Sequence, residues 1–135
     1  MRTIHAIRLK PGEDLRLSIE QYAKDQNIQA GWIVTCVGSL TRYNLRFANQ
    51  AAGHIRDGFF EIISLSGTLS VDGCHFHLAV GDTNGTLTGG HLLHGCIVYT
   101  TAEVVIEETT DLVFMRESDG STHFKELQIK SSSEC

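Results

Sequence analysis

One segment of the chain has the spacing of apolar residues that an amphipathic α-helix requires. It begins after Pro11-Gly12, which ends an extended segment, and runs to about Asn27. Four apolar residues recur at i, i+4, i+7 and i+8 and would share one helix face; they are Leu15, Ile19, Tyr22 and Ala23. Asp14 is typical of an N-cap, because its carboxylate can accept hydrogen bonds from the first backbone N–H groups. This is the only strong helical pattern in the sequence.

Most of the remaining chain shows the alternation or the β-branched runs that are typical of strands. Strands are predicted over residues 2–9, 32–37, 43–48, 59–71, 74–80, 97–107, 112–116 and 124–129. Asp72-Gly73 and Asn84-Gly85 are hairpin-turn signals. The polar residues 49–57 are predicted to form a loop.

One helix and this set of strands predict an α+β fold. We expect a single domain over residues 1–130, with a mainly antiparallel β-sheet of about seven strands and one main helix. Residues 131–135 have little to bury and are predicted to be a mobile tail. One helix can cover only part of such a sheet, so a second copy of the chain is an economical cover for the rest, and we expect self-association.

Length and composition limit the function classes. A chain of 135 residues that is 41% hydrophobic and 20% charged fits one globular domain. Its formal net charge of −5 works against non-specific binding of nucleic-acid phosphates, although a local basic patch is not excluded. No apolar run suits a signal peptide or reaches the roughly 18 residues of a membrane span. The four cysteines have no C-x-x-C spacing, so we expect free thiols in the cytoplasm and no cysteine zinc site.

Four of the seven histidines lie close together in the sequence. His75 and His77 are two residues apart, a spacing that puts both side chains on the same face of a strand. His91 follows a Gly-Gly pair, which lets a chain come close to a neighbouring strand. Three convergent imidazoles could bind zinc and leave a fourth position open, or they could be hydrogen-bonded polar residues of an exposed strand. His94 follows a turn and is predicted to lie outside the metal ligands.

Glu61 is a carboxylate in an otherwise apolar strand, between Phe60 and Ile62. If it is buried, it needs a hydrogen bond or a cation. Two interpretations stay open. The carboxylate could accept hydrogen bonds from backbone or hydroxyl groups, or it could orient a metal-binding imidazole from behind.

Other chemistries have weaker support. The sequence has neither a G-x-S-x-G nucleophile motif nor a phosphate-binding loop with its lysine, so no catalytic residue is assigned. The basic residues are enriched in the first half of the chain, and Arg42, Arg46 and Arg56 are candidates for a nucleic-acid patch. Acidic residues interrupt them, and a solvated surface is the simpler interpretation.

Several motifs follow one another from about Arg2 to Arg116. They are Pro11-Gly12-Glu13-Asp14-Leu15, Gly38-Ser39-Leu40, Phe60-Glu61-Ile62-Ile63-Ser64-Leu65-Ser66-Gly67-Thr68, His75-Phe76-His77-Leu78, Gly89-Gly90-His91-Leu92 and Gly95. Taken together and in this order, they resemble the PPC domain, also called PCC, the "plants and prokaryotes conserved" family. The resemblance implies a compact α+β fold with an antiparallel sheet, assembly as a homotrimer, and a family label of DNA-binding protein.

In the plant members of that family, DNA binding is carried by AT-hook segments with an Arg-Gly-Arg-Pro core, while the PPC domain serves trimerisation and partner contacts. This sequence has no Arg-Gly-Arg-Pro motif, and Phe59 stands where the plant proteins have an arginine. Its H-x-H and G-G-H pattern resembles the stand-alone prokaryotic members, for which a divalent metal near the subunit interface is the natural interpretation. The resemblance therefore implies a homotrimer that binds zinc or another divalent metal through His75, His77 and His91, with no assigned enzyme activity. DNA binding is the alternative.

Overall fold

The computed structural model describes residues 1–134 as one antiparallel sheet domain with a single α-helix. In chain order the elements are β1 (Arg2–Leu9), α1 (Leu15–Asp25), β2 (Ala30–Arg46), β3 (His54–Ser70), β4 (Gly73–Gly81), β5 (Leu87–Leu92), β6 (Ile97–Thr109), β7 (Leu112–Glu117), β8 (Glu126–Ser131) and the short 3₁₀ helix η1 (Ser132–Glu134). The predicted α+β class is confirmed, with eight strands in two sheets.

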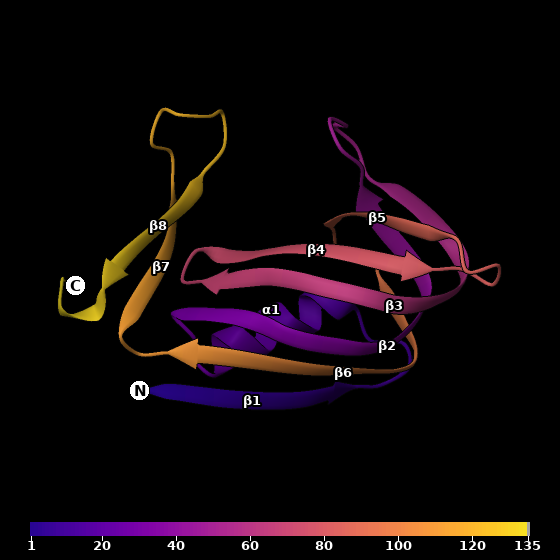
Figure 1. The fold of residues 1–135 in the computed structure, drawn as a ribbon, viewed down its shortest axis with the longest axis horizontal. Helices are drawn as coiled ribbons and strands as arrows, with labels where there is room; N and C mark the ends of the chain where they lie inside the picture. Colours follow the sequence, from indigo (N-terminus) through magenta and orange to yellow (C-terminus); the bar gives the residue numbers. More distant parts are fainter. Residues whose placement is uncertain (135) are drawn as a thin grey trace.

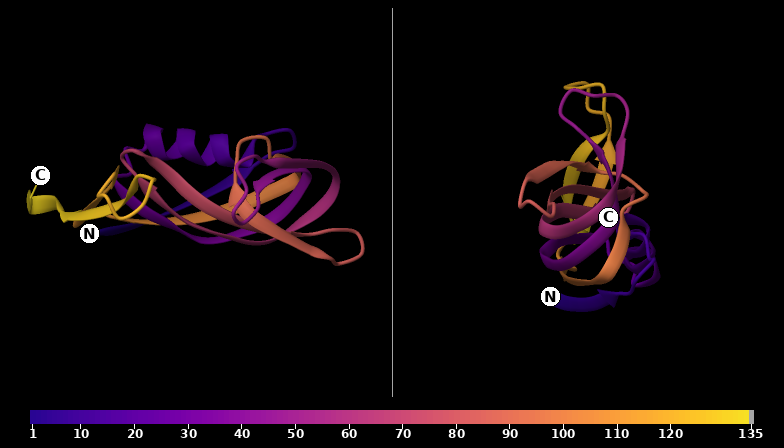
Figure 2. Two further views of the ribbon diagram at one scale, coloured as in Figure 1. Left: turned by 90° about the horizontal axis from the view of Figure 1, so that it is seen from above. Right: turned by 90° about the vertical axis from the view of Figure 1, so that its right-hand side faces the viewer.

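The main sheet has six strands in the order β1-β6-β2-β3-β4-β5, and β5 also pairs with β2. All of these pairings are antiparallel. Because β5 returns to β2, one end of the sheet curls into a closed ring of four strands (Figure 2, right). This closure brings β5 between β4 and β2 and so positions the histidine-bearing segment.

The helix α1 covers one face of the sheet, as the view from above shows (Figure 2, left). Leu15, Ile19 and Ala23 are buried, as their spacing predicts, and the Asp14 side chain accepts a hydrogen bond from the Leu17 backbone N–H at 2.9 Å. The helix ends just before Asn27, whose φ of 52° is left-handed and cannot continue an α-helix. Beneath the helix, the largest fully buried side chains include Leu40, Leu45, Leu69, Phe76, Leu78, Leu92 and Ile106.

Two sequence predictions about strand limits are wrong. The separate strands predicted at 32–37 and 43–48 form the single strand β2, which continues through Gly38 with register shifts against β6. Gly38 permits this close pairing, since a Cβ there would lie 2.0 Å from the carbonyl oxygen of Thr101. The predicted loop 49–57 is also too long, because β3 begins at His54, which pairs with Leu45 and stacks on Phe47 with ring centroids 4.5 Å apart.

Strands β7 and β8 form a two-stranded sheet that projects from one end of the main sheet (Figure 1). Backbone hydrogen bonds of Phe114 attach it, to Val71 at 3.0 Å and to Gln29 at 2.9 Å.

The predicted mobile tail, 131–135, starts with the last residue of β8 and the 3₁₀ turn η1, while Cys135 lies outside the described residues. None of the helices in the described chain has the length and apolar character needed to cross a membrane.

Candidate metal centre

Strand β4 presents its two histidines on the open side of the sheet. Its residues alternate strictly, with Phe76 and Leu78 buried in the core and His75 and His77 exposed between them. The alternation follows from the pleat of an extended chain, which turns successive side chains to opposite faces. The sequence prediction that His75 and His77 share one face agrees with this register.

Strand β5 brings His91 to the same place. His91 is the direct cross-strand partner of His77 on one side and of Arg46 on the other. The close fit of β5 between its neighbours depends on Gly90, where a Cβ would lie 2.7 Å from the carbonyl oxygen of Arg46. The Gly-Gly-His motif therefore has a steric cause: a side chain at this position would push β5 away from β2 and carry His91 with it.

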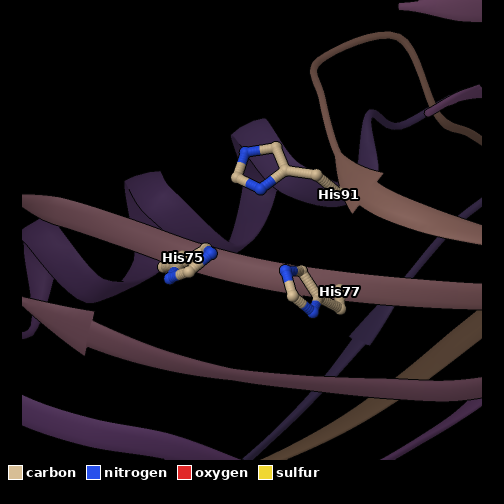
Figure 3. A group of neighbouring side chains, drawn as sticks. All are labelled: His75, His77 and His91. Atoms are coloured by element: carbon tan, nitrogen blue, oxygen red, sulfur yellow. The ribbon is translucent and has the colours of Figure 1, made fainter. Parts of the chain in front are cut away.

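The three imidazoles form a compact donor set (Figure 3). One nitrogen from each of His75, His77 and His91 lies within 4.8 Å of the other two, and the ring centroids are 5.1, 5.2 and 5.9 Å apart. A tetrahedral zinc ion with Zn–N bonds of about 2.0–2.1 Å holds its ligand nitrogens about 3.3 Å apart. Small ring rotations would close that difference, so the donor set fits a metal with three protein ligands and one open position.

The electrostatic surroundings keep two of these rings neutral, the form in which a ring nitrogen can bind a metal. Burial, with the nearby Arg46 guanidinium as the next cause, lowers the pKa of His91 to about 4. Burial and the charge of Arg116 also lower the pKa of His75. Both imidazoles therefore offer an unprotonated nitrogen at neutral pH.

The cluster opens into a cleft of about 1010 Å³. Its walls come from the segment after β2, residues 47–51, and from Phe124 in the connection between β7 and β8. Both segments project upward from the body of the molecule in Figure 1. A bound ion at the cluster would thus face a space large enough for a small molecule rather than a sealed interior.

His94 lies apart from the cluster, as its sequence position predicts. Its Nε2 is 3.1 Å from a carboxylate oxygen of Glu20 on α1, and its side chain is more than half exposed. It is not among the described residues whose ligand atoms converge. The other carboxylate oxygen of Glu20 accepts a hydrogen bond from Arg16 at 2.5 Å.

Glu61, the carboxylate predicted to lie behind an imidazole, is not brought to the cluster. It is exposed on β3 and pairs with Gly81, whereas His77 pairs with Ser66, five residues farther along the same strand. Five residues of strand span about 17 Å. Glu126 at the start of β8 is a carboxylate near the histidines, and its charge acts on the pKa of His75. No sequence pattern connects Glu126 with β4.

The three arginines proposed as a nucleic-acid patch have different surroundings. Arg42 forms an ion pair with Asp57, with Nε 2.6 Å from a carboxylate oxygen. Arg56 lies over the Phe60 ring and 3.8 Å from Asp82. Arg46 alone of the three lines the cleft beside the histidines.

Two further arginines near the site were missed by sequence reasoning. Arg116 on β7 donates to the Thr68 hydroxyl at 3.0 Å and has the same nitrogen 3.4 Å from Nδ1 of His75. Arg16 on α1 donates to the carbonyl oxygens of Cys74 and Leu92, which are the backbone neighbours of His75 and His91. Only the tertiary contacts show that these residues reach the site, because each lies on a distant element.

The three thiols of the described residues are free, as the sequence predicts. Burial raises the pKa of Cys36 and of Cys74 to about 12, and burial raises that of Cys96 to about 11. None of the three is in a disulfide. Protonated thiols are poor nucleophiles and poor metal ligands, so the metal-binding chemistry of the described residues rests on the imidazoles.

Comparison with known proteins confirms the resemblance that the motifs indicate. Residues 1–110 match the model of the Plants and Prokaryotes Conserved (PCC) domain. Two proteins named Bifunctional protein GlmU, from Synechococcus sp. strains JA-3-3Ab and JA-2-3B'a(2-13), are 42% identical over 132 residues and 43% identical over 127 residues. These matches cover 98% and 94% of this chain but only 21% and 20% of the relatives, so the chain spans about a fifth of their length.

Solved structures share the fold. A hypothetical protein from Salmonella cholerae-suis has a TM-score of 0.94 and 41% identity, covering 97% of this chain and 95% of its own. A metal-containing protein from Archaeoglobus fulgidus has a TM-score of 0.80 and 25% identity, covering 93% of each chain. A protein from Bacteroides thetaiotaomicron, provisionally named DNA-binding, has a TM-score of 0.84 but 21% identity, with 93% and 91% covered, and it shows the fold alone.

Proposed function

The chain belongs to the Plants and Prokaryotes Conserved (PCC) domain family, and we propose that it is a homotrimeric protein that binds one divalent metal ion per subunit through His75, His77 and His91. The observation that carries the proposal is the convergence of three imidazole nitrogens within 4.8 Å of one another. The similar protein from Archaeoglobus fulgidus, named as metal-containing, supports it.

Zinc is the proposed metal because it readily takes three imidazole ligands and a fourth, exchangeable position. Imidazole also suits copper, iron and nickel, so the identity of the ion is part of the test. A bound zinc ion would supply Lewis acidity at its open position. The chain's own residues would hold it there, with the β4 register fixing His75 and His77 and the closure of β5 onto β2 fixing His91.

Elemental analysis of protein purified without a histidine tag tests this proposal. We expect about one equivalent of metal per chain in the wild type, and a loss of most of it in His77→Ala. The matched control is His94→Ala, which removes an imidazole outside the cluster and should leave the metal content unchanged. A metal-free wild type, or a His77→Ala variant that keeps its metal, would refute the proposed site.

The homotrimer is proposed from the apolar side chains that the sheet leaves uncovered. Val37, Phe59 and Ile63 on β2 and β3 are each more than half exposed, and Phe59 makes an edge-on contact with the Tyr99 ring at 5.2 Å between centroids. Exposed apolar patches of this kind mark interaction surfaces.

Light scattering after size-exclusion chromatography should give three times the 14.9 kDa chain mass, and Phe59→Ser should lower it. Phe124→Ser, on the projecting hairpin connection, is the control, and a wild-type mass of one chain would contradict the trimer.

DNA binding is the alternative function, and the provisional name of the Bacteroides thetaiotaomicron structure is the observation that favours it. The formal net charge of −5 and the ion pairs of Arg42 and Arg56 oppose it. A gel-shift assay with duplex DNA at physiological ionic strength separates the two functions. We expect no complex; a complex that weakens steeply with salt would establish the alternative.

A further inference from the structure

Arg46 is a half-buried cation without a partner. Its side chain makes no hydrogen bond and no ion pair with any residue of the described chain, 1–134, whereas Arg42, Arg56 and Arg116 each contact a neighbour. It lies opposite His91 in the β2–β5 pair, so both side chains project from the same face of the sheet. A partly buried guanidinium with five unused N–H donors is costly unless something accepts from them.

Arg116 places a second guanidinium beside the same cluster. Its Nη2 contacts the Thr68 hydroxyl and lies close to His75, and the backbone N–H of Arg116 donates to Asp72 at 2.9 Å. The two arginines therefore stand next to different imidazoles, and they come from β2 and from β7. Both line a smaller cleft of about 340 Å³ that also contains His75 and His91.

The balance of charge around the histidines favours an anion. The larger cleft is lined by Arg46 and by no acidic residue. In the smaller cleft, Arg46, Arg116 and Lys125 face only Asp72 and Glu126, and Asp72 already accepts the hydrogen bond from the Arg116 backbone. A divalent cation on three neutral imidazoles would add two further positive charges here. Like charges at such short range repel, so an anionic ligand is what this arrangement lacks.

We propose that the cleft over the histidine cluster binds the oxyanion group of a small ligand, a carboxylate or a phosphate, held by Arg46 and Arg116 beside the metal position. Guanidinium groups match both oxyanions, because two N–H groups can donate to two oxygens in parallel. Phe124 lines both clefts and Phe47 lines the larger one, and their aromatic rings offer an apolar surface to the rest of the ligand. A metal ion at the histidines would add to the attraction that the arginines exert on the oxyanion, and this contribution rests on the proposed function.

The two guanidiniums also predict how metal and oxyanion influence each other. Each positive charge near the histidines opposes the binding of a metal cation, and a bound oxyanion offsets that charge. Because coupling between two ligands is reciprocal, we expect the oxyanion to bind more tightly to the metal-loaded protein, and zinc to bind more tightly when the oxyanion is present.

Isothermal titration calorimetry at constant ionic strength tests the oxyanion site. Inorganic phosphate and succinate are titrated separately into the wild type, Arg46→Gln and Arg42→Gln, each as purified and after loading with zinc. We expect Arg46→Gln to weaken binding of the preferred probe by at least about tenfold, the value of one charge-assisted hydrogen bond. Arg42→Gln, which removes an equal charge that is paired elsewhere, should bind as the wild type does. The tighter of the two probes identifies the source of the oxyanion.

Metal analysis of the same samples separates this proposal from the previous one. If the wild type holds no metal but Arg46→Gln still weakens anion binding, the oxyanion site stands and the metal site falls. If the metal is present and the wild type binds neither probe, or Arg46→Gln and Arg42→Gln bind equally, the oxyanion site falls alone. Arg46→Gln should fold normally because its side chain has no partner to lose, and a melting temperature equal to that of Arg42→Gln would verify this.

Discussion

The two faces of β4 carry opposite properties within a few residues of each other. On the core side, Phe76 and Leu78 are almost completely buried, and Cys74 is half-buried with a protonated thiol. On the open side, His75 and His77 line a cleft, and their ring nitrogens are accessible to a ligand. One face holds the domain together and the other is free for chemistry, and the pleat of a single strand separates them. The contrast teaches that stability and binding can be changed independently along this strand.

The largest effect should come from Phe76→Ala on the core side. Phe76 is 0% exposed, and truncating a buried phenylalanine costs about 3–5 kcal/mol through lost burial and the cavity that remains. His77→Ala, one residue away, should change the free energy of unfolding of the metal-free protein by only about 0.5 kcal/mol, as surface substitutions do. Urea denaturation of both metal-free variants compares them, and equal destabilisation would break the distinction between the faces.

The reactivity of the Cys74 thiol tests how well the core side of β4 is closed to solvent. A pKa raised by burial from 9.0 to about 12 reduces the thiolate fraction at pH 8 by about a thousandfold. Alkylation of the folded protein at pH 8 should therefore label Cys74 at least a thousandfold more slowly than in guanidinium-unfolded protein. Mass spectrometry of the labelled peptides measures this site by site. Rapid labelling of native Cys74 would show that the core side of β4 is open to reagents.

Arg16 connects the core side of the fold with the site. It lies on the helix, and its side chain hydrogen-bonds the backbone next to His75 and His91. Arg16→Met removes hydrogen bonds to two carbonyl oxygens and should cost about 1–3 kcal/mol of folding free energy. It should also weaken metal binding by about tenfold, since groups that orient metal ligands have effects of that size. Competition with a chelating dye measures the affinity. Arg16→Lys keeps the charge but cannot reach both carbonyls in the same way, so its metal affinity should lie between those of the wild type and Arg16→Met. A normal metal affinity in Arg16→Met would contradict the positioning role.

The smallest effect is expected at His94. Its side chain is mostly exposed and contacts Glu20 at 3.1 Å, and it lines neither of the two clefts at the histidine cluster. His94→Gln should change the free energy of unfolding by no more than about 0.5 kcal/mol and should leave the metal affinity as it is. A chelator titration that shows weaker metal binding in this variant would place His94 within the site.

Local patterns predicted a large part of this fold. The helix over α1, its Asp14 cap and the β3–β4 hairpin all follow from residues that are neighbours in the sequence. The continuity of β2 through Gly38 was not predictable in this way, because a glycine ends a strand as readily as it allows close pairing, and the carbonyl of Thr101 that decides the matter is far away in the chain. The extension of β3 back to His54 likewise depends on its pairing with Leu45.

The candidate site likewise contains residues that sequence patterns indicated and residues that only tertiary contacts bring to it. The family motifs and the two-residue spacing indicated His75, His77 and His91, and the structure brings these three together. Glu61 was a candidate to orient an imidazole because it is a carboxylate in an otherwise apolar strand, but the pairing register puts it about 17 Å along β3 from the partner of His77. Glu126 and Arg116 carry no recognisable pattern and reach the cluster only through the β7–β8 hairpin.

The alternation of residues along β4 is enough to predict two chemically different faces, because an extended chain turns alternate side chains to opposite sides whatever surrounds it. Which residues stand beside the open face depends on contacts between distant segments. The return of β5 to β2 sets His91 and Arg46 against His75 and His77, and this closure depends on pairings between segments more than forty residues apart in the chain. Such pairings are set by the packing of the whole sheet rather than by any local spacing, so they decide where the charges of the site meet.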